Sequence, residues 1–377
     1  MPTTELFIVV ALTVGATFFV VVVAIGLILN KFIELKQMRS RQNLYKFYAS
    51  MLADLLLQPV EEPRGRRKSR LFDHYEKLLQ PVKSGLSWSS IRRRQMHQEA
   101  VRQVLIDFAK DLTGESLERL QYFFYSLGFV DESIALLQDR RWWIRAQAAR
   151  DLGLIRARRA TAALTIALED DSEDVRTLAM QSLAVLVGVE GLGTILKGMR
   201  NLSRWAALEL SVIVREYEEK SVPFLIEALT FRDQSVVLFS IEMLAEIGFV
   251  TAVEPLLEMA RRYPNVIVRA KALEALGRLG DARSEGVLRE ALVNPYPLLR
   301  SAAVRGLERI GSPASVPLLR ERIWNGPIDE RISAARAMAK SGKAGLNELH
   351  ALESGTDGVV TGIAGQVLEE LGEGARG

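Results

Sequence analysis

Cysteine is absent from the 377-residue chain, and histidine occurs only at His74, His97 and His350. Without cysteine the chain has no disulfides, no thiolate metal ligands and no cysteine nucleophile. Three histidines also leave little material for the metal and general-base chemistry in which imidazole takes part. We therefore expect neither a cofactor nor a metal.

Net charge is also small, because 49 basic and 46 acidic residues leave only +3. The balance nevertheless differs between segments. Residues 1–30 carry −1, residues 31–110 carry +9 (17 Lys/Arg minus 8 Asp/Glu), and residues 111–377 carry −5 (32 minus 37). A composition that is 49% apolar and 25% charged is typical of a folded protein and argues against a disordered chain.

Charged residues are missing altogether from residues 6–29, which read LFIVVALTVGATFFVVVVAIGLIL. A helix of these 24 residues is about 36 Å long at about 1.5 Å per residue, enough to cross a hydrocarbon layer of about 30 Å. A cleaved signal peptide is disfavoured, because no basic residue precedes the run and no small-residue cleavage site follows it. Lys and Arg cluster only after the run, so the positive-inside rule predicts a single-pass membrane protein with its N-terminus outside and the remaining chain in the cytoplasm.

The basic segment 30–114 is predicted to be helical and to lie beside the membrane. Apolar residues at three- and four-residue steps from Leu44 to Leu56 form a stripe that lies on the bilayer, packs on a partner or packs on the rest of the chain. A loop after it holds five cations within seven positions, and three more open a helix expected over residues 89–112. At about 1 kcal/mol per charge, such cations are candidate contacts for anionic lipid head groups or an acidic partner. They are Arg64, Arg66, Arg67, Lys68, Arg70, Arg92, Arg93 and Arg94.

A similar sequence motif recurs about every 31 residues from residue 140 onward, as in WWIRAQAARDLG, NVIVRAKALEALGRLGDA and YPLLRSAAVRGLERIGSPA. Each period holds two short amphipathic helices that bury their apolar faces only against neighbouring copies, which predicts an α-solenoid. The anchor positions of eight copies are Arg145, Arg176, Arg204, Val237, Arg269, Arg300, Arg331 and Val360, with spacings of 31, 28, 33, 32, 31, 31 and 29 residues.

The Val-Arg pair, the spaced alanines and the Leu-Gly before the second helix resemble the bacterial HEAT-like repeats that also occur in phycobilin lyases. The resemblance covers residues 115–371. It implies an all-α fold, in which an N-terminal single transmembrane helix (6–29) is followed by an α-solenoid of HEAT-like repeats, with residues 372–377 as a disordered tail. The arrangement is similar to bacterial membrane-anchored HEAT-repeat proteins, which places the expected anchor in the bacterial inner membrane.

Arginine and tryptophan recur within the repeats, and both are enriched in binding hot spots. The arginines occupy one repeat position beside Asp or Asn turn residues, so we expect them to pair and to cap helices between repeats rather than to bind a ligand. The candidate docking residues are the aromatics Trp142, Trp143, Trp205 and Trp324.

Three enzyme families with this kind of repeat can be compared residue by residue. Deoxyhypusine hydroxylases need His-Glu metal motifs, which the three histidines do not form. HEAT-like DNA glycosylases need a basic groove, whereas residues 111–377 are acidic, so no nucleic acid partner is expected. A phycobilin lyase fits by repeat type, but a membrane anchor does not suit a pigment-attachment factor of that kind.

The sequence therefore predicts a non-enzymatic, membrane-anchored scaffold whose cytoplasmic solenoid docks membrane-associated protein partners, with no evident small-molecule substrate. The resemblance suggests a membrane enzyme complex as partner, such as an envelope or exopolysaccharide glycosyltransferase. The alternative is a phycobilin-lyase-like or chaperone-like accessory factor that acts on a protein substrate.

Overall fold

The structure is a computed structural model that describes residues 2–57, 75–77, 79–84 and 91–374. Side chains are described for these residues except 2–18, 20, 21, 33, 91–93, 373 and 374. All regular structure in the described ranges is helical, as predicted. The described chain forms two compact units. Unit 1 runs to Gln138 and includes Leu154–Ala157, and unit 2 contains Asp139–Gly153 and the chain from Arg158 onward.

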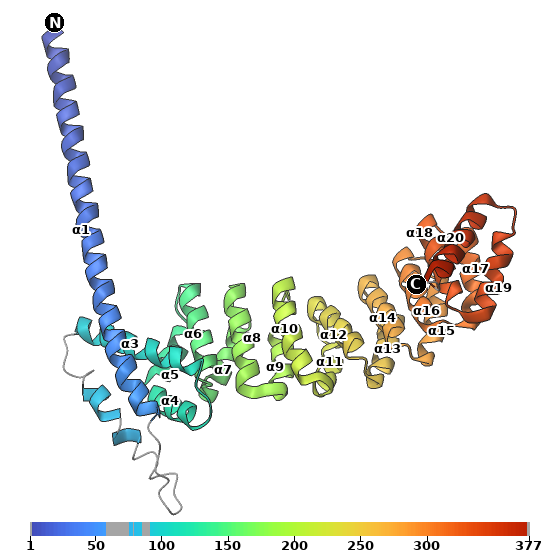
Figure 1. Cartoon of the computed structure of the whole chain (residues 1–377), viewed down its shortest axis with the longest axis horizontal. Coiled ribbons are helices and arrows are strands. Elements are labelled where there is room, and N and C mark those ends of the chain that lie inside the picture. Colours follow the sequence, from blue (N-terminus) through green and yellow to red (C-terminus); the bar gives the residue numbers. More distant parts are fainter. Residues whose placement is uncertain (1, 58–74, 78, 85–90, 375–377) are drawn as a thin grey trace, which may run out of the picture. The chain divides into compact units, whose positions relative to one another are not determined.

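The first element of unit 1 is one uninterrupted helix, α1 (Pro2–Leu57), shown in blue in Figure 1. Its 56 residues correspond to a rod of about 84 Å at about 1.5 Å per residue. The charge-free run 6–29 forms its N-terminal part, and the basic residues that follow continue in the same helix. No turn therefore separates the apolar and basic segments.

The C-terminal part of α1 packs against α3 (Ile91–Ala109) and α4 (Gly114–Ser126). Tyr48, Leu52 and Leu56 repeat at four-residue steps and are fully buried, because such steps fall on one face of a helix. The Tyr48 hydroxyl lies 2.8 Å from His97 Nδ1. Of the three locations considered for this apolar stripe, these residues pack on neighbouring helices of the chain, whereas Phe47 is 61% exposed.

A buried arginine fixes the end of α1. Arg119 of α4 donates from Nη1 to the carbonyl oxygens of Leu55 and Leu56, at 2.8 and 3.3 Å. The last carbonyls of a helix have no partner within it, so a buried cation there satisfies both the hydrogen-bonding and the dipole requirement. The guanidinium also lies over the ring of Tyr75, 5.2 Å from its centre. Helix α5 (Phe129–Leu136) completes unit 1.

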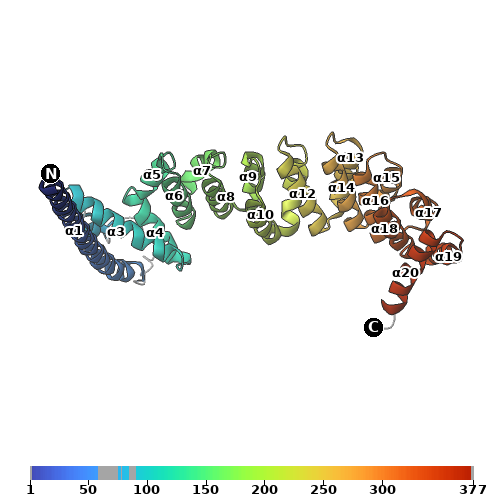
Figure 2. The same ribbon diagram turned by 90° about the horizontal axis from the view of Figure 1, so that it is seen from above.

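Unit 2 is a stack of helix pairs, each with a first and a second helix (Figure 1). Seen from above, the second helices α9, α13 and α15 form one row and the first helices α10, α14 and α16 the other (Figure 2). The first helices are α6 (Trp142–Leu154), α8 (Glu173–Val187), α10 (Arg204–Tyr217), α12 (Gln234–Ile247), α14 (Val266–Leu279), α16 (Pro297–Ile310), α18 (Ile328–Ala339) and α20 (Gly358–Gly374). The second helices are α7 (Thr161–Ala167), α9 (Leu192–Gly198), α11 (Val222–Ala228), α13 (Val253–Arg262), α15 (Glu285–Leu292), α17 (Val316–Asn325) and α19 (Gly342–Glu353).

The helix starts correct the register of two repeats. Counted from the start of each first helix, the anchor arginine is the fourth residue, as in Arg145 of α6 and Arg300 of α16. In α10 that position is Ala207, not Arg204, and in α20 it is Thr361, not Val360. The spacings then become 31, 31, 30, 32, 31, 31 and 30 residues. Ser203, whose hydroxyl accepts from the amide of Ala206 and caps α10, is the local signal for the true start.

The stack is tightest between α14 and α16. A Cβ atom added at Gly277 would lie 2.3 Å from the Cα atom of Gly306. A side chain at Gly277 would therefore force the two helices apart, whereas one at Gly306 would first meet the side chain of Leu288, 2.6 Å from the added Cβ.

By length and composition, one stretch among the described residues could cross a membrane, namely Glu173–Gly198 with a mean hydropathy of 1.6. It comprises α8, a 3₁₀ turn at Gly188–Gly191 and α9, and half of its most apolar window is buried. It therefore consists of two core helices of the solenoid. Most side chains of the run 6–29 lie outside the described residues, so the predicted transmembrane helix stays a prediction.

Candidate docking surface

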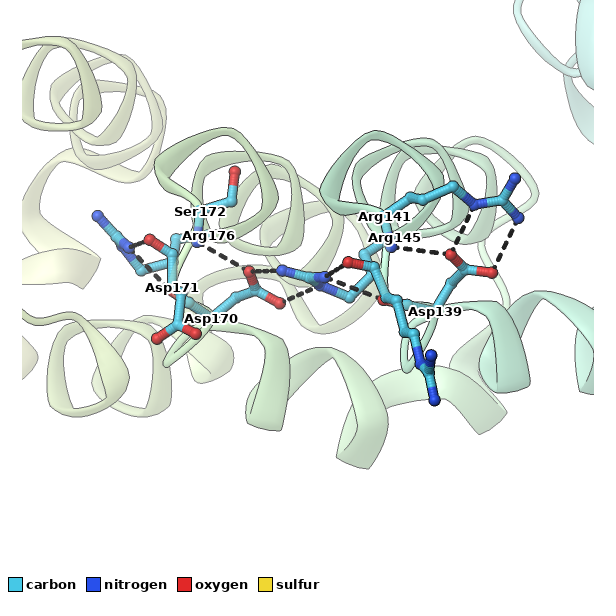
Figure 3. A network of polar contacts seen from close by, with 8 residues as sticks. Asp139, Arg141, Arg145, Asp170, Asp171, Ser172 and Arg176 are labelled. Carbon is cyan, nitrogen blue, oxygen red and sulfur yellow. Dashed lines mark hydrogen bonds and ion pairs between the residues drawn. The ribbon is translucent and has the colours of Figure 1, made fainter.

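The recurring arginines close the turns between repeats. Arg145 Nη1 donates to the carbonyl oxygen of Asp139 at 2.9 Å, and Arg176 Nη1 donates to that of Asp170 at 2.7 Å (Figure 3). Arg300 and Arg331 repeat the contact with their own preceding turns, and Arg269 reaches the last turn of α13. Their hydrogen bonds are Arg269 to Ala260 at 3.0 Å, Arg300 to Asn294 at 3.1 Å and Arg331 to Gly326 at 2.7 Å. The five arginines are thus structural, because each satisfies carbonyls that a turn leaves unpaired.

Two of these arginines also couple one repeat to the next. Arg145 binds both carboxylate oxygens of Asp170 at 2.6 Å, and Arg300 binds both of Glu330 at 3.0 and 3.1 Å. Burial by itself raises the pKa of Asp170, but hydrogen bonds from Arg145 and from the Ser172 amide outweigh it and hold the pKa below the usual value. The carboxylate therefore stays ionised within the stack.

The outward faces of the first helices are joined by further polar contacts that bridge consecutive repeats. Many long side chains there find an opposite charge or an amide on the adjacent first helix, which neutralises part of the charge on this face. The pairs are Gln181–Glu209, Arg215–Glu246, Lys271–Glu242, Arg278–Glu242, Arg305–Glu274, Lys340–Glu308 and Arg336–Glu370.

Exposed apolar side chains gather on one edge of the stack, which we call the inter-repeat edge. It consists of the last two residues of each second helix, the turn that follows, and the first two residues of the next first helix. All four candidate tryptophans lie on it: Trp142 and Trp143 open α6, Trp205 is the second residue of α10, and Trp324 is the penultimate residue of α17. Trp142 and Trp143 meet edge to face, with ring centres 6.1 Å apart.

The second residue of the first helix is the recurrent feature of this edge. Trp143 is 52% exposed and Trp205 is 60% exposed. The residue after each, such as Ala206 after Trp205, is at least half buried and does the packing, so a repeat needs no apolar side chain at the second position. Five of eight copies in the described stack nevertheless carry one there. They are Trp143, Trp205, Ile267, Leu298 and Val359.

A pocket of about 1000 Å³ opens on the same edge, between the turns that precede α12 and α14. Phe231, Met259 and Tyr263 line it together with Pro255. This is a repeat in which the anchor position holds Val237, so no arginine closes the turn that contributes Phe231. The pocket lies between the repeats of Trp205 and Ile267 and interrupts the row of exposed side chains with a concave patch that also contains Glu258, Arg261 and Arg262.

The opposite edge, where a first helix turns into its own second helix, has a different composition. Its exposed side chains are mainly charged, and Val250 is its most exposed large apolar residue in the described chain. Arg283 lowers the pKa of the neighbouring Asp281 to about 2 by donating to its carboxylate. The charged residues are Arg158, Arg159, Glu190, Glu218, Glu219, Lys220, Asp281 and Arg283. Exposed tryptophans therefore lie on the inter-repeat edge, whereas the opposite edge exposes only scattered valines such as Val187 and Val250 among its charged residues in the described chain.

Sequence reasoning identified the four tryptophans but not the edge that unites them. It missed Ile267, Leu298 and Val359, which occupy the position of Trp143 and Trp205, because aliphatic residues in a repeat suggest core. Counting residues from the N-cap of each first helix would have assigned them to its second position. The predicted basic contacts Arg64, Arg66, Arg67, Lys68 and Arg70 lie outside the described residues, as do the side chains of Arg92 and Arg93, and Arg94 is exposed.

The paired helices and the 31-residue register define an α-solenoid. Within it, residues 253–339 match the family model of HEAT repeats, so this part of the chain consists of HEAT repeats. No curated protein matches the chain.

Several solved structures resemble the chain at low identity. Kap121p bound to Nup53p is 11% identical, with 87% of this chain and 41% of that chain covered and a TM-score of 0.45. Human deoxyhypusine hydroxylase is 17% identical, with 89% and 98% covered and a TM-score of 0.28. The CpcE–CpcF complex of phycocyanin lyase from Nostoc is 20% identical, with 63% and 94% covered and a TM-score of 0.27.

Proposed function

We propose that the protein is a non-enzymatic scaffold that α1 anchors in the bacterial inner membrane and that docks protein partners through the inter-repeat edge of its cytoplasmic solenoid. The observation that carries the docking proposal is the row of apolar side chains exposed at one repeat position, next to a pocket lined by aromatic and charged residues. A few residues supply most of the binding energy of protein interfaces, and tryptophan is enriched among them.

Support for the anchor comes from the exposure of α1. Phe19 is 68% exposed, and the other described apolar residues up to Leu29 are also exposed on every side of the helix. A helix that is apolar on every side is unfavourable in water, whereas the hydrocarbon core of a bilayer is a favourable environment for it. The exposed residues are Phe19, Val22, Val23, Ile25, Leu27, Ile28 and Leu29. Helix α1 meets its packing partners α3 and α4 only beyond this section.

The orientation proposed is N-terminus outside and solenoid inside, because the cations of α1 all follow the apolar run. A cytoplasm-dependent reporter fused after residue 377 should therefore be active, and the whole chain should resist alkaline extraction from membranes. A phosphatase that is active only after export, fused at the same position, would contradict the orientation if it were active.

Docking is tested by purifying the tagged chain from detergent-solubilised membranes and identifying bound proteins by mass spectrometry. Trp143→Ala with Trp205→Ala should remove partners that the natural chain retains. Val250→Ala, which trims an equally exposed apolar residue on the opposite edge, should retain them. Loss of the same partners from both variants would refute the assignment to this edge. That the partner is a glycosyltransferase complex stays a prediction from the resemblance alone.

A further inference from the structure

A second concave surface lies in unit 1, between α1 and α3, and has a volume of about 990 Å³. Lys36, Gln37, Arg41 and Tyr45 line it from α1, and Glu99 and Gln103 are among the residues that line it from α3. Its floor is apolar, with the buried Ala100 and the half-buried Met96. The groove therefore combines cations and amide donors at its rim with a small apolar base.

The cations of this groove have no partner among the residues that the structure describes. Neither Lys36 nor Arg41 makes an ion pair or a side-chain hydrogen bond with any described residue, and both are exposed. Two unneutralised cations beside glutamine amides form a set of donors with few acceptors, which suits an anion with several oxygens. Glu99 is the one carboxylate in the lining, so the two cations leave the groove with a net charge of +1.

The position of the groove along α1 selects the source of that anion. Exposed apolar side chains continue past Leu29 to Phe32, Leu35 and Met38, and the groove begins at Lys36. Lys36 lies about 10 Å beyond Leu29 along the helix at about 1.5 Å per residue, and its long side chain can reach back toward the bilayer. The mouth of the groove thus falls at the depth of phospholipid head groups.

We infer that the α1–α3 groove binds the phosphodiester head group of an anionic phospholipid in the cytoplasmic leaflet, with Lys36 and Arg41 as its phosphate ligands. This inference rests on the proposed anchor, because the lipid must belong to the leaflet that α1 crosses. It goes beyond general attraction to the membrane, since it assigns the lipid to two of the five cations on α1 and to one side of the helix.

Helix α1 itself offers a matched control. Arg39 and Lys46 are exposed cations on the same helix that do not line the groove. At about 100° per residue they lie on the side opposite the groove. The double variants K36Q/R41Q and R39Q/K46Q lose the same charge, so a difference between them reports position and not net charge.

The experiment uses the full-length chain purified in detergent and native mass spectrometry to count bound phosphatidylglycerol or phosphatidylcholine. Relative to the natural chain, K36Q/R41Q should bind phosphatidylglycerol about thirtyfold more weakly, at about fivefold for each charge. R39Q/K46Q should change binding less than about threefold, as expected for exposed charges farther from the ligand. Glu99→Gln should act in the opposite direction and strengthen binding about fivefold. Phosphatidylcholine should bind weakly to all four proteins.

Equal weakening in both double variants would overturn the groove and leave only general charge attraction. Inorganic phosphate that displaces the lipid from the groove would show a site for free phosphate instead. Failure of the anchor is recognised separately: a chain that alkaline extraction releases from membranes refutes the proposed function, whereas a chain that stays inserted but binds both lipids equally refutes only the groove.

Discussion

The cations of α1 and the arginines of unit 2 differ in whether they are paired with other described residues of the chain. Between Lys31 and Lys46, helix α1 carries five cations, and none pairs with a described residue. In unit 2, the turn-closing arginines bind carbonyl oxygens of the turns between repeats, and neighbouring first helices are bridged by ion pairs. A cation that holds a fold is paired within it, whereas a cation left unpaired on a rigid helix remains available to something outside the chain.

The largest effect is expected at Arg300, whose side chain is 14% exposed and whose partner Glu330 is 5% exposed. Arg300→Ala leaves a buried carboxylate and two turn carbonyls without a partner, so we expect the free energy of unfolding to fall by about 3–5 kcal/mol. Urea denaturation of the full chain in detergent measures it. Arg305→Ala, which breaks an exposed pair with Glu274, should cost less than about 1 kcal/mol. Equal costs would erase the distinction between turn-closing and surface arginines.

The next largest effect is expected on acidification, through the paired carboxylates of unit 2. Burial raises the pKa of Glu242 and Asp233, but hydrogen bonds to each outweigh it and lower the pKa below its ordinary value, as for Asp170. A lowered pKa in the folded state means that the carboxylate stabilises the fold above its unfolded pKa and loses this contribution as the pH falls through the folded value.

Stability of unit 2 should therefore be constant near neutral pH and decline below about pH 4, the usual range of these carboxyls. Circular dichroism during acid titration follows the decline. Unchanged melting from about pH 6 down to about pH 2 would show that these ion pairs do not stabilise the fold.

Removal of the exposed tryptophans should affect binding more than folding. Because Trp143 and Trp205 stand largely in solvent, each alanine substitution should change the free energy of unfolding by less than about 1 kcal/mol. If they anchor a partner, each should weaken its binding by about 2 kcal/mol or more. Titration against the partner recovered from membranes measures the second quantity. A large loss of stability without a loss of affinity would make them packing residues.

The smallest effect on folding is expected on α1. Arg39→Gln and Arg41→Gln remove cations that pair with no described residue, so the free energy of unfolding should stay within about 0.5 kcal/mol of the natural chain. Thermal melting of both variants in detergent tests it. A loss as large as that of Arg300→Ala would mean that the cations of α1 are structural after all.

Much of the fold could be predicted because a solenoid repeats its local rules. Fixed spacing and apolar stripes indicated helix pairs, and turn residues indicated structural arginines. The third repeat was misregistered because Arg204 imitates the anchor three residues early, while the capping Ser203 marks the helix start. The residue type of Arg204 therefore indicated the wrong register, whereas the capping residue Ser203 indicates the right one.

Contacts distant in sequence could not be predicted. Arg119 reaches carbonyls of α1 that lie 63 and 64 residues before it, and no periodicity relates the two. The shared edge of the tryptophans could not be predicted for a similar reason. Trp324 lies near the end of a second helix and Trp205 near the start of a first helix. Only the stacking of helix pairs brings the ends of second helices and the starts of first helices to the same side.

The unbroken course of α1 has a geometric consequence. A helix without a hinge transmits rotation: one residue inserted between Leu29 and Lys36 would turn everything beyond it by about 100° about the helix axis and advance it by about 1.5 Å. If a bilayer holds its apolar part, as proposed, the number of residues in α1 sets the direction in which Tyr48 and Leu52 face their packing partners. The length of this helix would then fix a direction as well as a distance from the membrane.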